Sequence, residues 1–179
     1  KKQLNLSGKK VIGHVGRFNE QKNHFFLLHI FKEISDKDEN IVLLLVGDGN
    51  LRSLLEKECE RLKIKDKVKF LGERRDIPDL LQAFDLFLFP SLYEGLPVTL
   101  IEAQAAGLKI VASNTITKEV DMADLITFCD LKDSERKWAE IVLSNINYER
   151  KNTLEIIKKG RYDIYENAKE LENFYLNLN

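Results

Sequence analysis

The sequence predicts an α/β fold: a doubly wound, Rossmann-like parallel sheet of about six strands, with helices on both faces and a helical C-terminal tail. Two observations support this fold. Short apolar runs alternate along the chain with segments whose apolar residues recur at helical spacing, which is the order of elements in α/β proteins. The strand-like runs are apolar at consecutive positions, which is typical of parallel sheets covered on both faces. Right-handed crossovers between such strands produce a doubly wound sheet.

The predicted strands are short and largely apolar, and they cover residues 11–16, 41–46, 68–71, 86–89, 109–112 and 126–128. The first three segments between them have apolar residues three or four positions apart, which predicts helices. Those positions are Phe26, Leu27, Ile30, Phe31 and Ile34; then Leu51, Leu54, Leu55, Cys59 and Leu62; then Ile77, Leu80 and Leu81. A further helix is expected over 97–106, ended by Gly107. From Ser134 onward the pattern is helical throughout.

Composition restricts the class of protein. The 179 residues are expected to form one domain, and with 44% apolar and 32% charged residues they can bury a sizeable core. The net charge of -1 gives no electrostatic reason to expect nucleic acid. There is no apolar run of about 18 residues and no signal peptide, which favours a cytoplasmic protein. The chain starts with Lys1 and its only methionine is Met122, so we expect part of a longer protein with a domain missing upstream.

Polar and glycine-containing segments directly follow five of the predicted strands. Ligands of doubly wound sheets bind outside the carboxyl ends of the strands, so these segments should share one rim. Asp36 and Asp38 instead precede a strand, which places them at the opposite rim as a solvated turn. The rim segments are 16–17, 47–49, 72–75, 90–94 and 113–115.

The most informative segment is 93–103, where two carboxylates, Glu94 and Glu102, lie eight residues apart. Gly95 is expected to permit a tight turn, and Pro97 suits the first position of the helix that follows. Free N–H groups at the start of that helix form an anion site. Beside such a site Glu102 can accept hydrogen bonds from ribose hydroxyls, and Glu94 can reach a hydroxyl-bearing group beyond the phosphate. Taken singly, either carboxylate also fits an exposed surface position.

Two cations, Arg17 and Lys22, follow the first strand five residues apart. They match a diphosphate, since an arginine fork and an ammonium group can share its oxygens, although either one alone would usually be a surface charge. Gly47 and Gly49 are not followed by a third glycine, because Arg52 stands at that position. The dinucleotide-binding fingerprint is therefore absent, and the two glycines are expected only to make a turn.

The histidines and cysteines give no metal-binding pattern. His14 lies within a strand and His29 in an apolar helix, so both are interpreted as structural residues with satisfied hydrogen bonds. His24 also lacks metal spacing. Cys59 continues an apolar helix face and is interpreted as core packing, and it has no partner spacing with Cys129.

Together these segments resemble the C-terminal, donor-binding domain of retaining glycosyltransferases with the two-Rossmann-domain (GT-B) architecture, family 4, also called glycosyl transferases group 1. Glu94 and Glu102 match the E-x7-E motif of that family. The helical tail is similar to members that build capsular polysaccharide or exopolysaccharide. The resemblance covers Val11 to Thr115 and is carried by the segments 15–18, 21–24, 45–49, 70–72, 90–97 and 102–107.

The resemblance implies a role for each matching residue. Arg17 and Lys22 would hold the donor diphosphate and Glu94 would contact the donor sugar, so these three are the expected catalytic residues. Glu102 would bind the ribose. Some members have glycine where Pro97 stands, and a phosphate contact through that N–H is impossible with proline. The other expected donor-binding residues are Gly16, Glu73, Arg74, Gly95, Leu96, Val98 and Thr99.

The resemblance further implies that residues 1–179 form one nucleotide-sugar-binding domain, the C-terminal half of an enzyme whose N-terminal domain is absent. That enzyme would transfer a sugar from a nucleotide diphosphate to a saccharide or lipid-linked acceptor in surface polysaccharide biosynthesis, and this half alone would be inactive. No metal or cofactor is expected, because Arg17 and Lys22 supply positive charge. The expected location is the cytoplasm, with peripheral contact to the inner face of the membrane, and no nucleic-acid partner.

Two alternatives remain open from the residues. A nucleotide-sugar epimerase-like enzyme shares the architecture, although the paired glutamates disfavour it. A non-catalytic nucleotide-binding or interaction module would keep the fold and lack the reaction. A second Rossmann-like half upstream in the reading frame would favour the enzyme over such a module.

Overall fold

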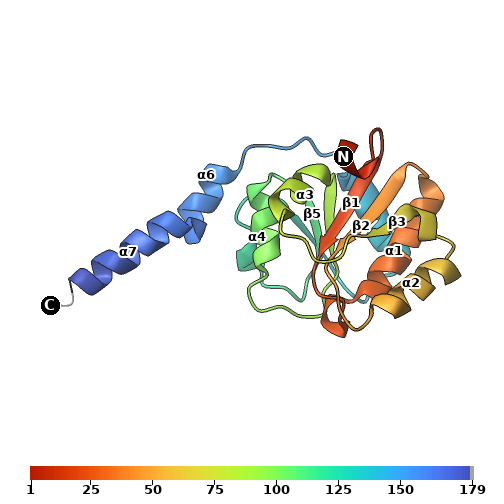
Figure 1. Ribbon diagram of the computed structural model, residues 1–179, viewed down its shortest axis with the longest axis horizontal. Coiled ribbons are helices and arrows are strands. Elements are labelled where there is room, and N and C mark those ends of the chain that lie inside the picture. The colour runs from red at the N-terminus through yellow and green to blue at the C-terminus, as the bar shows by residue number, and fades with distance from the viewer. Residues whose placement is uncertain (178–179) are drawn as a thin grey trace.

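The structure is a computed structural model that describes residues 1–177, without the side chain of Arg161. At its centre lies a six-stranded sheet in the order β3-β2-β1-β4-β5-β6, and every neighbouring pair is parallel (Figure 1). The predicted parallel sheet is confirmed. Its strands are β1 (Lys10–Val15), β2 (Ile41–Val46), β3 (Val68–Phe70), β4 (Leu86–Phe89), β5 (Ile110–Ser113) and β6 (Ile126–Cys129).

Helices cover both faces of the sheet because side chains alternate along each strand. In β2, Leu43 and Leu45 belong to the core shared with α1 (His24–Lys37), α2 (Arg52–Arg61) and α5 (Glu135–Asn145). Leu44, between them, belongs to the core on the other face, which α3 (Ile77–Ala83) and α4 (Val98–Ala105) cover. Two apolar cores therefore hold the sheet from both sides, as the consecutive apolar runs predicted.

The C-terminal tail is helical, as predicted, and consists of α6 (Leu154–Ile157), the π-helical turn η5 (Lys158–Tyr162) and α7 (Ile164–Leu176). Ile157 is buried against the α3–α4 side, whereas α7 extends away from the sheet (Figure 1). No described helix combines the length and apolar character that a membrane span requires. The remaining elements are the short turns η1 (Lys2–Leu4), η2 (Glu20–Lys22), η3 (Lys65–Lys67) and η4 (Lys118–Val120).

Three local expectations are wrong. Leu54 is 51% exposed, so the buried face of α2 consists of Leu55 and Cys59 and does not include it. Pro97 is the N-cap of α4 and not its first helical residue, because the chain before the helix is still turning at that point. Gly95 is not needed for the turn, since its φ lies outside the left-handed region that favours glycine.

Gly47 does more than make a turn, contrary to expectation. Its φ is +133°, and a Cβ placed on it would lie 2.1 Å from the carbonyl oxygen of Gly16. Gly49 is similar, because a Cβ there would lie 2.4 Å from the carbonyl oxygen of Phe18. Both glycines thus let the loop after β2 approach the loop after β1, and their lack of side chains shapes the rim.

We predict that Gly47→Ala lowers the free energy of unfolding by about 3 kcal/mol, because the methyl group meets backbone and the residue must keep a strained φ. Gly95→Ala is the matched control: a Cβ there meets nothing within 4 Å, so stability should change by less than about 0.5 kcal/mol. Urea unfolding of the three proteins measures both values. Equal stability of the two variants would contradict this account of the rim.

Candidate functional site at the carboxyl rim

The loops after the strands meet at one rim, as the parallel order requires. Gly16 N donates a hydrogen bond to Val46 O at 2.9 Å, and Gly47 N donates to Gly72 O at the same distance. The loops after β1, β2 and β3 are therefore joined directly through their backbones. Asp36 is exposed and paired with Lys32, as expected of a solvated position, but it lies in the last turn of α1 and not in a loop.

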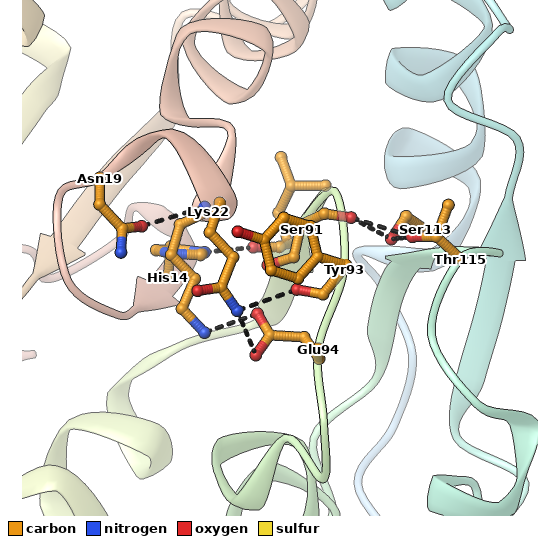
Figure 2. Close-up of polar contacts among 10 residues, drawn as sticks. His14, Asn19, Lys22, Ser91, Tyr93, Glu94, Ser113 and Thr115 are labelled. Atoms are coloured by element: carbon orange, nitrogen blue, oxygen red, sulfur yellow. Dashed lines mark hydrogen bonds and ion pairs between the residues drawn. The ribbon is translucent and has the colours of Figure 1, made fainter.

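Lys22 and Glu94 form an ion pair at the rim (Figure 2). Lys22 Nζ donates to Glu94 Oε1 at 2.6 Å, and the two side chains are only 16% and 8% exposed. The 3₁₀ turn η2 places Lys22, while Glu94 comes from the loop between β4 and α4. A charge pair this poorly hydrated is costly to break from one side only, since the remaining charge has little water to solvate it.

Two further side chains fasten the loop that carries Lys22 to the loop that carries Glu94. Gln21 Nε2 donates to Tyr93 O at 3.0 Å and to Glu94 Oε2 at 3.4 Å, while Gln21 O accepts from Leu92 N at 2.8 Å. Asn23 Nδ2 donates to Pro90 O at 3.2 Å. Sequence reasoning assigned no role to Gln21 or Asn23. The sequence feature that could have indicated a role is their position on either side of Lys22, in the segment that follows the first strand.

Asn19 and Asn23 shape the turn that presents Lys22. Asn19 is the N-cap of η2, and its side-chain oxygen accepts from Lys22 N at 3.3 Å. Asn23 has φ 55°, a left-handed conformation that asparagine tolerates better than most residues. These two asparagines let the chain turn sharply twice and then enter α1.

Buried rings lie directly beneath Lys22. The Lys22 ammonium is 4.9 Å from the centroid of the Phe89 ring, which in turn stacks on His14 at 5.5 Å. The ring of His24 meets that of His14 edge-on at 4.7 Å. His14 Nδ1 lies 2.9 Å from Leu88 O, whereas His14 Nε2 has no hydrogen-bond partner among the described residues. The expectation that His14 is fully satisfied is therefore wrong.

His29 behaves as expected. Its Nε2 lies 2.7 Å from Glu58 Oε1, and Arg61 binds the same carboxylate. The hydrogen bonds from Arg61 and then from His29 lower the pKa of Glu58 to about 2, despite an opposing effect of burial. This cluster lies between α1 and α2 and is structural.

A hollow of about 330 Å³ opens beside Gly16, at the ends of β1 and β2. It brings together three of the predicted donor-binding residues, Gly16, Glu73 and Arg74, with Ile77 at the start of α3. Arg74 is held by a bidentate ion pair with Asp76, at 2.6 and 2.7 Å. Arg17 is exposed on the loop beside Gly16.

Glu102 is exposed on α4 and lines a second hollow of about 250 Å³ between α3 and α4, with Pro78, Leu81, Gln82, Ala105 and Ala106. Loss of water around its carboxyl group raises the pKa of Glu102. Because Ile77 lines the first hollow and Pro78 the second, the two hollows follow one another along α3. The structure thus places Glu102 near the rim without joining it to the pair of Lys22 and Glu94.

The start of α4 is open. The helix has no side-chain cap at Pro97, so the N–H group of Thr99 in its first turn is available to an anion. Val98 N and Leu100 N are used locally, since they donate to Leu96 O at 3.0 Å and to Pro97 O at 2.9 Å. Leu96 and Val98 are 52% and 55% exposed, and the space around Gly95 is empty to 4 Å. This segment can therefore receive a ligand without rearrangement of the core.

A doubly wound parallel sheet defines this chain as a Rossmann-like protein, and proteins with such sheets bind their ligands at the carboxyl rim. Comparison with protein families goes further. The chain belongs to the glycosyl transferases group 1 family, whose model matches residues 1–124. The predicted membership is confirmed.

Named relatives agree with this family. The chain is 38% identical over 169 residues to the putative glycosyltransferase EpsF of Bacillus subtilis (strain 168), which is 92% of this chain and 44% of that protein. It is 29% identical over 168 residues to the capsular polysaccharide biosynthesis glycosyltransferase CapH of Staphylococcus aureus, covering 91% and 46%. The chain thus spans less than half the length of these relatives. Their names do not favour the epimerase-like alternative.

Solved structures share the fold. Anabaena HepE in complex with UDP and glucose superposes with a TM-score of 0.81 at 23% identity, over 99% of this chain and 50% of that one. The C-terminal domain of LpcC, a glycosyl transferase group 1 family protein from Francisella tularensis, superposes with a TM-score of 0.73 at 18% identity, over 91% of each chain. At these identities the likeness establishes the fold alone.

The buried histidines predict how stability depends on pH. Burial, aided by the charge of Lys22, lowers the pKa of His24 from 6.5 to about 4. Between these values the unfolded chain binds a proton that the folded chain does not, so the free energy of unfolding falls as pH decreases from about 6.5 to about 4. His24 alone should contribute about 3 kcal/mol to that fall, and His14, whose pKa is also lowered, acts in the same direction.

Urea unfolding at pH 7 and pH 4.5 tests this for the chain and for His24→Leu. The difference in stability between the two pH values should be clearly smaller in the variant, because the remaining titrating groups are common to both proteins. An identical difference in the two proteins would show that His24 is not neutral in the fold.

Proposed function

We propose that the carboxyl rim binds the nucleoside diphosphate of a sugar donor, and that the whole protein is a retaining glycosyltransferase that builds a surface polysaccharide. The observation that carries the proposal is the contact of Lys22 with Glu94 beside Gly16. It provides a cation for a diphosphate and a carboxylate for sugar hydroxyls at one place. Family membership supports the reaction class.

The diphosphate would bind among fixed positive groups. Lys22 would supply an ammonium group, Arg17 a guanidinium fork from the exposed loop, and the first turn of α4 the N–H group of Thr99. Glu94 competes with the diphosphate for Lys22 in the free protein. Binding of the donor would therefore release Glu94, which could then accept hydrogen bonds from the sugar.

The nucleoside would lie in the hollow beside Gly16. At about 330 Å³, the hollow has room for a base, and Glu73 and Arg74 flank it. Glu102 lines the neighbouring hollow along α3, from which its carboxylate would accept hydrogen bonds from the ribose hydroxyls. HepE, which shares the fold, has been crystallised with UDP and with UDP-glucose, which supports a nucleoside diphosphate as the ligand.

The reaction would place charge where these groups can stabilise it. As the bond between the sugar carbon and the β-phosphate oxygen breaks, its electron pair stays with the departing nucleoside diphosphate. Lys22, Arg17 and the N–H group of Thr99 would face that growing negative charge and lower the barrier. The acceptor hydroxyl oxygen would form the new bond to the same sugar carbon, and its proton would pass to an oxygen of the departing diphosphate. Because the protein supplies the positive charge, the proposal includes no metal or other cofactor.

The rest of the enzyme would meet the acceptor. Since the chain spans 44% of EpsF and 50% of HepE, the proposed protein has an N-terminal domain that carries the acceptor site, and this half alone transfers nothing. An Escherichia coli relative, 38% identical over 107 residues (58% of this chain and 28% of that protein), is named UDP-Gal:alpha-D-GlcNAc-diphosphoundecaprenol alpha-1,3-galactosyltransferase. A saccharide or lipid-linked acceptor, reached in the cytoplasm at the inner face of the membrane, is consistent with that name.

We predict that Lys22→Met weakens binding of the preferred nucleoside diphosphate by about tenfold to hundredfold, since a hydrogen bond to a charged group contributes about 1.5–3 kcal/mol. Calorimetry with UDP, GDP, ADP and their sugar conjugates first identifies that ligand. Lys32→Met, which removes a half-buried lysine from α1 away from the rim, is the matched control and should bind normally.

Lys22→Met also leaves Glu94 without its cation, so the double variant Lys22→Met/Glu94→Gln should recover stability without recovering binding. Unchanged binding in Lys22→Met would contradict the proposed site. Binding of a donor by the chain together with no transfer by the whole protein would instead favour a non-catalytic module.

Removal of divalent metal should leave binding unchanged. With EDTA present, the dissociation constant for the same nucleoside diphosphate should stay within about twofold, because Arg17 and Lys22 provide the positive charge that a metal would otherwise supply. A loss of binding that Mg²⁺ or Mn²⁺ restores would show that the diphosphate is held through a metal.

A further inference from the structure

His14 is a fully buried histidine beneath the rim, and within residues 1–177 only one of its ring nitrogens has a hydrogen-bond partner. Nδ1 lies 2.9 Å from the carbonyl oxygen of Leu88. A carbonyl oxygen can only accept, so this contact assigns the ring hydrogen to Nδ1 and leaves Nε2 of the neutral ring as a bare acceptor. Buried acceptors without a partner are uncommon in folded proteins, and each one calls for an explanation.

The bare nitrogen faces the space next to Lys22. A Cβ placed on Gly16 would lie 3.0 Å from His14 Nε2 and 3.2 Å from Lys22 Cε, so the imidazole and the end of the lysine side chain border the same small space (Figure 2). Phe89 fixes both groups from below, since its ring stacks on His14 at 5.5 Å and lies 4.9 Å from Lys22 Nζ. A side chain at position 16 would fill this space.

A neutral hydrogen-bond acceptor is well suited to the position beside the Lys22 ammonium. Burial, aided by the charge of Lys22, lowers the pKa of His14 well below 6.5, so the ring carries no charge at neutral pH. Glu94, by contrast, cancels the charge of the ammonium that it binds. A neutral imidazole can orient the same ammonium while its full charge remains available to an anion.

From this geometry, and resting on the proposed function, we infer that His14 is a positioning residue that acts through Lys22. When the Lys22 ammonium turns from Glu94 to a donor diphosphate, His14 Nε2 accepts one of its three N–H groups. Rotation at the end of the lysine side chain suffices, because Cε already borders the space that Nε2 faces. His14 itself contacts neither nucleotide nor sugar.

Two variants of His14 distinguish the contribution of the Nε2 acceptor from the contribution of ring packing. His14→Phe keeps a ring against Phe89 and removes both nitrogens, whereas His14→Gln places an amide group where Nε2 lies. By calorimetry, His14→Phe should bind UDP about tenfold more weakly, as expected when a hydrogen bond to a charged group is lost, and His14→Gln should recover most of the affinity. His29→Phe, a histidine outside the site, should bind UDP normally.

Binding of UMP shows whether His14→Phe affects only the positioning of Lys22 or disrupts the whole site. Lys22 is expected to act on the diphosphate, so His14→Phe should leave UMP binding within about twofold of normal, and in a Lys22→Met background it should weaken UDP binding no further. An equal loss for UDP and UMP, or a full tenfold loss in the Lys22→Met background, would overturn the inference. So would UDP binding by His14→Phe as tight as that of the unsubstituted chain.

If His14→Phe does not fold, ¹⁵N NMR of the unsubstituted chain decides the question. Adding UDP should move the His14 Nε2 resonance from the position of a bare nitrogen toward that of a hydrogen-bonded one, and an unmoved resonance would contradict the inference. Failure of the unsubstituted chain to bind UDP, GDP or ADP would contradict the proposed function itself. Normal binding of UDP with an unmoved His14 resonance would contradict only the role inferred for His14.

Discussion

Lys22 and Glu94 form their ion pair where β1 and β4 lie side by side, and the rest of the rim is arranged around this contact. The strand order reverses at this point, and open α/β sheets bind ligands in the crevice that such a reversal creates. Neither charge has much water around it, so each depends on the other in the free protein. A ligand that binds Lys22 in place of Glu94 must also donate hydrogen bonds to the freed Glu94 carboxylate. The hydroxyl groups of a sugar attached to a diphosphate can donate them. In the proposed function, one contact therefore couples recognition of the phosphate to recognition of the sugar.

The sheet and its rim could be predicted because they follow from local patterns. Consecutive apolar residues, as in β2, require burial on both faces, and alternation with helices requires parallel order. Parallel order then brings every strand-following loop to one edge, which is why the loops that carry Lys22 and Glu94 were expected on the same rim. The likeness to a known family added the expected donor-binding roles of Glu73 and Arg74, which no local pattern specifies.

Other features could not be predicted because they depend on contacts between distant segments. The missing partner of His14 Nε2 becomes visible only when Leu88 and Gly16 are placed around the ring. The close approach of Gly47 to the loop after β1 depends on the three-dimensional path of both loops. The spacing of residues along the chain does not specify that distance. Glu102 has the expected spacing from Glu94 but faces the hollow along α3, because the α4 helix turns it away from the lysine.

The decisive measurement is a crystal structure of this chain with UDP bound. We expect diphosphate oxygens within hydrogen-bonding distance of Lys22 Nζ, Glu94 released from its present partner, and the nucleoside in the hollow between Gly16 and Arg74. UDP on another face of the sheet, with the pair of Lys22 and Glu94 intact, would contradict this expectation.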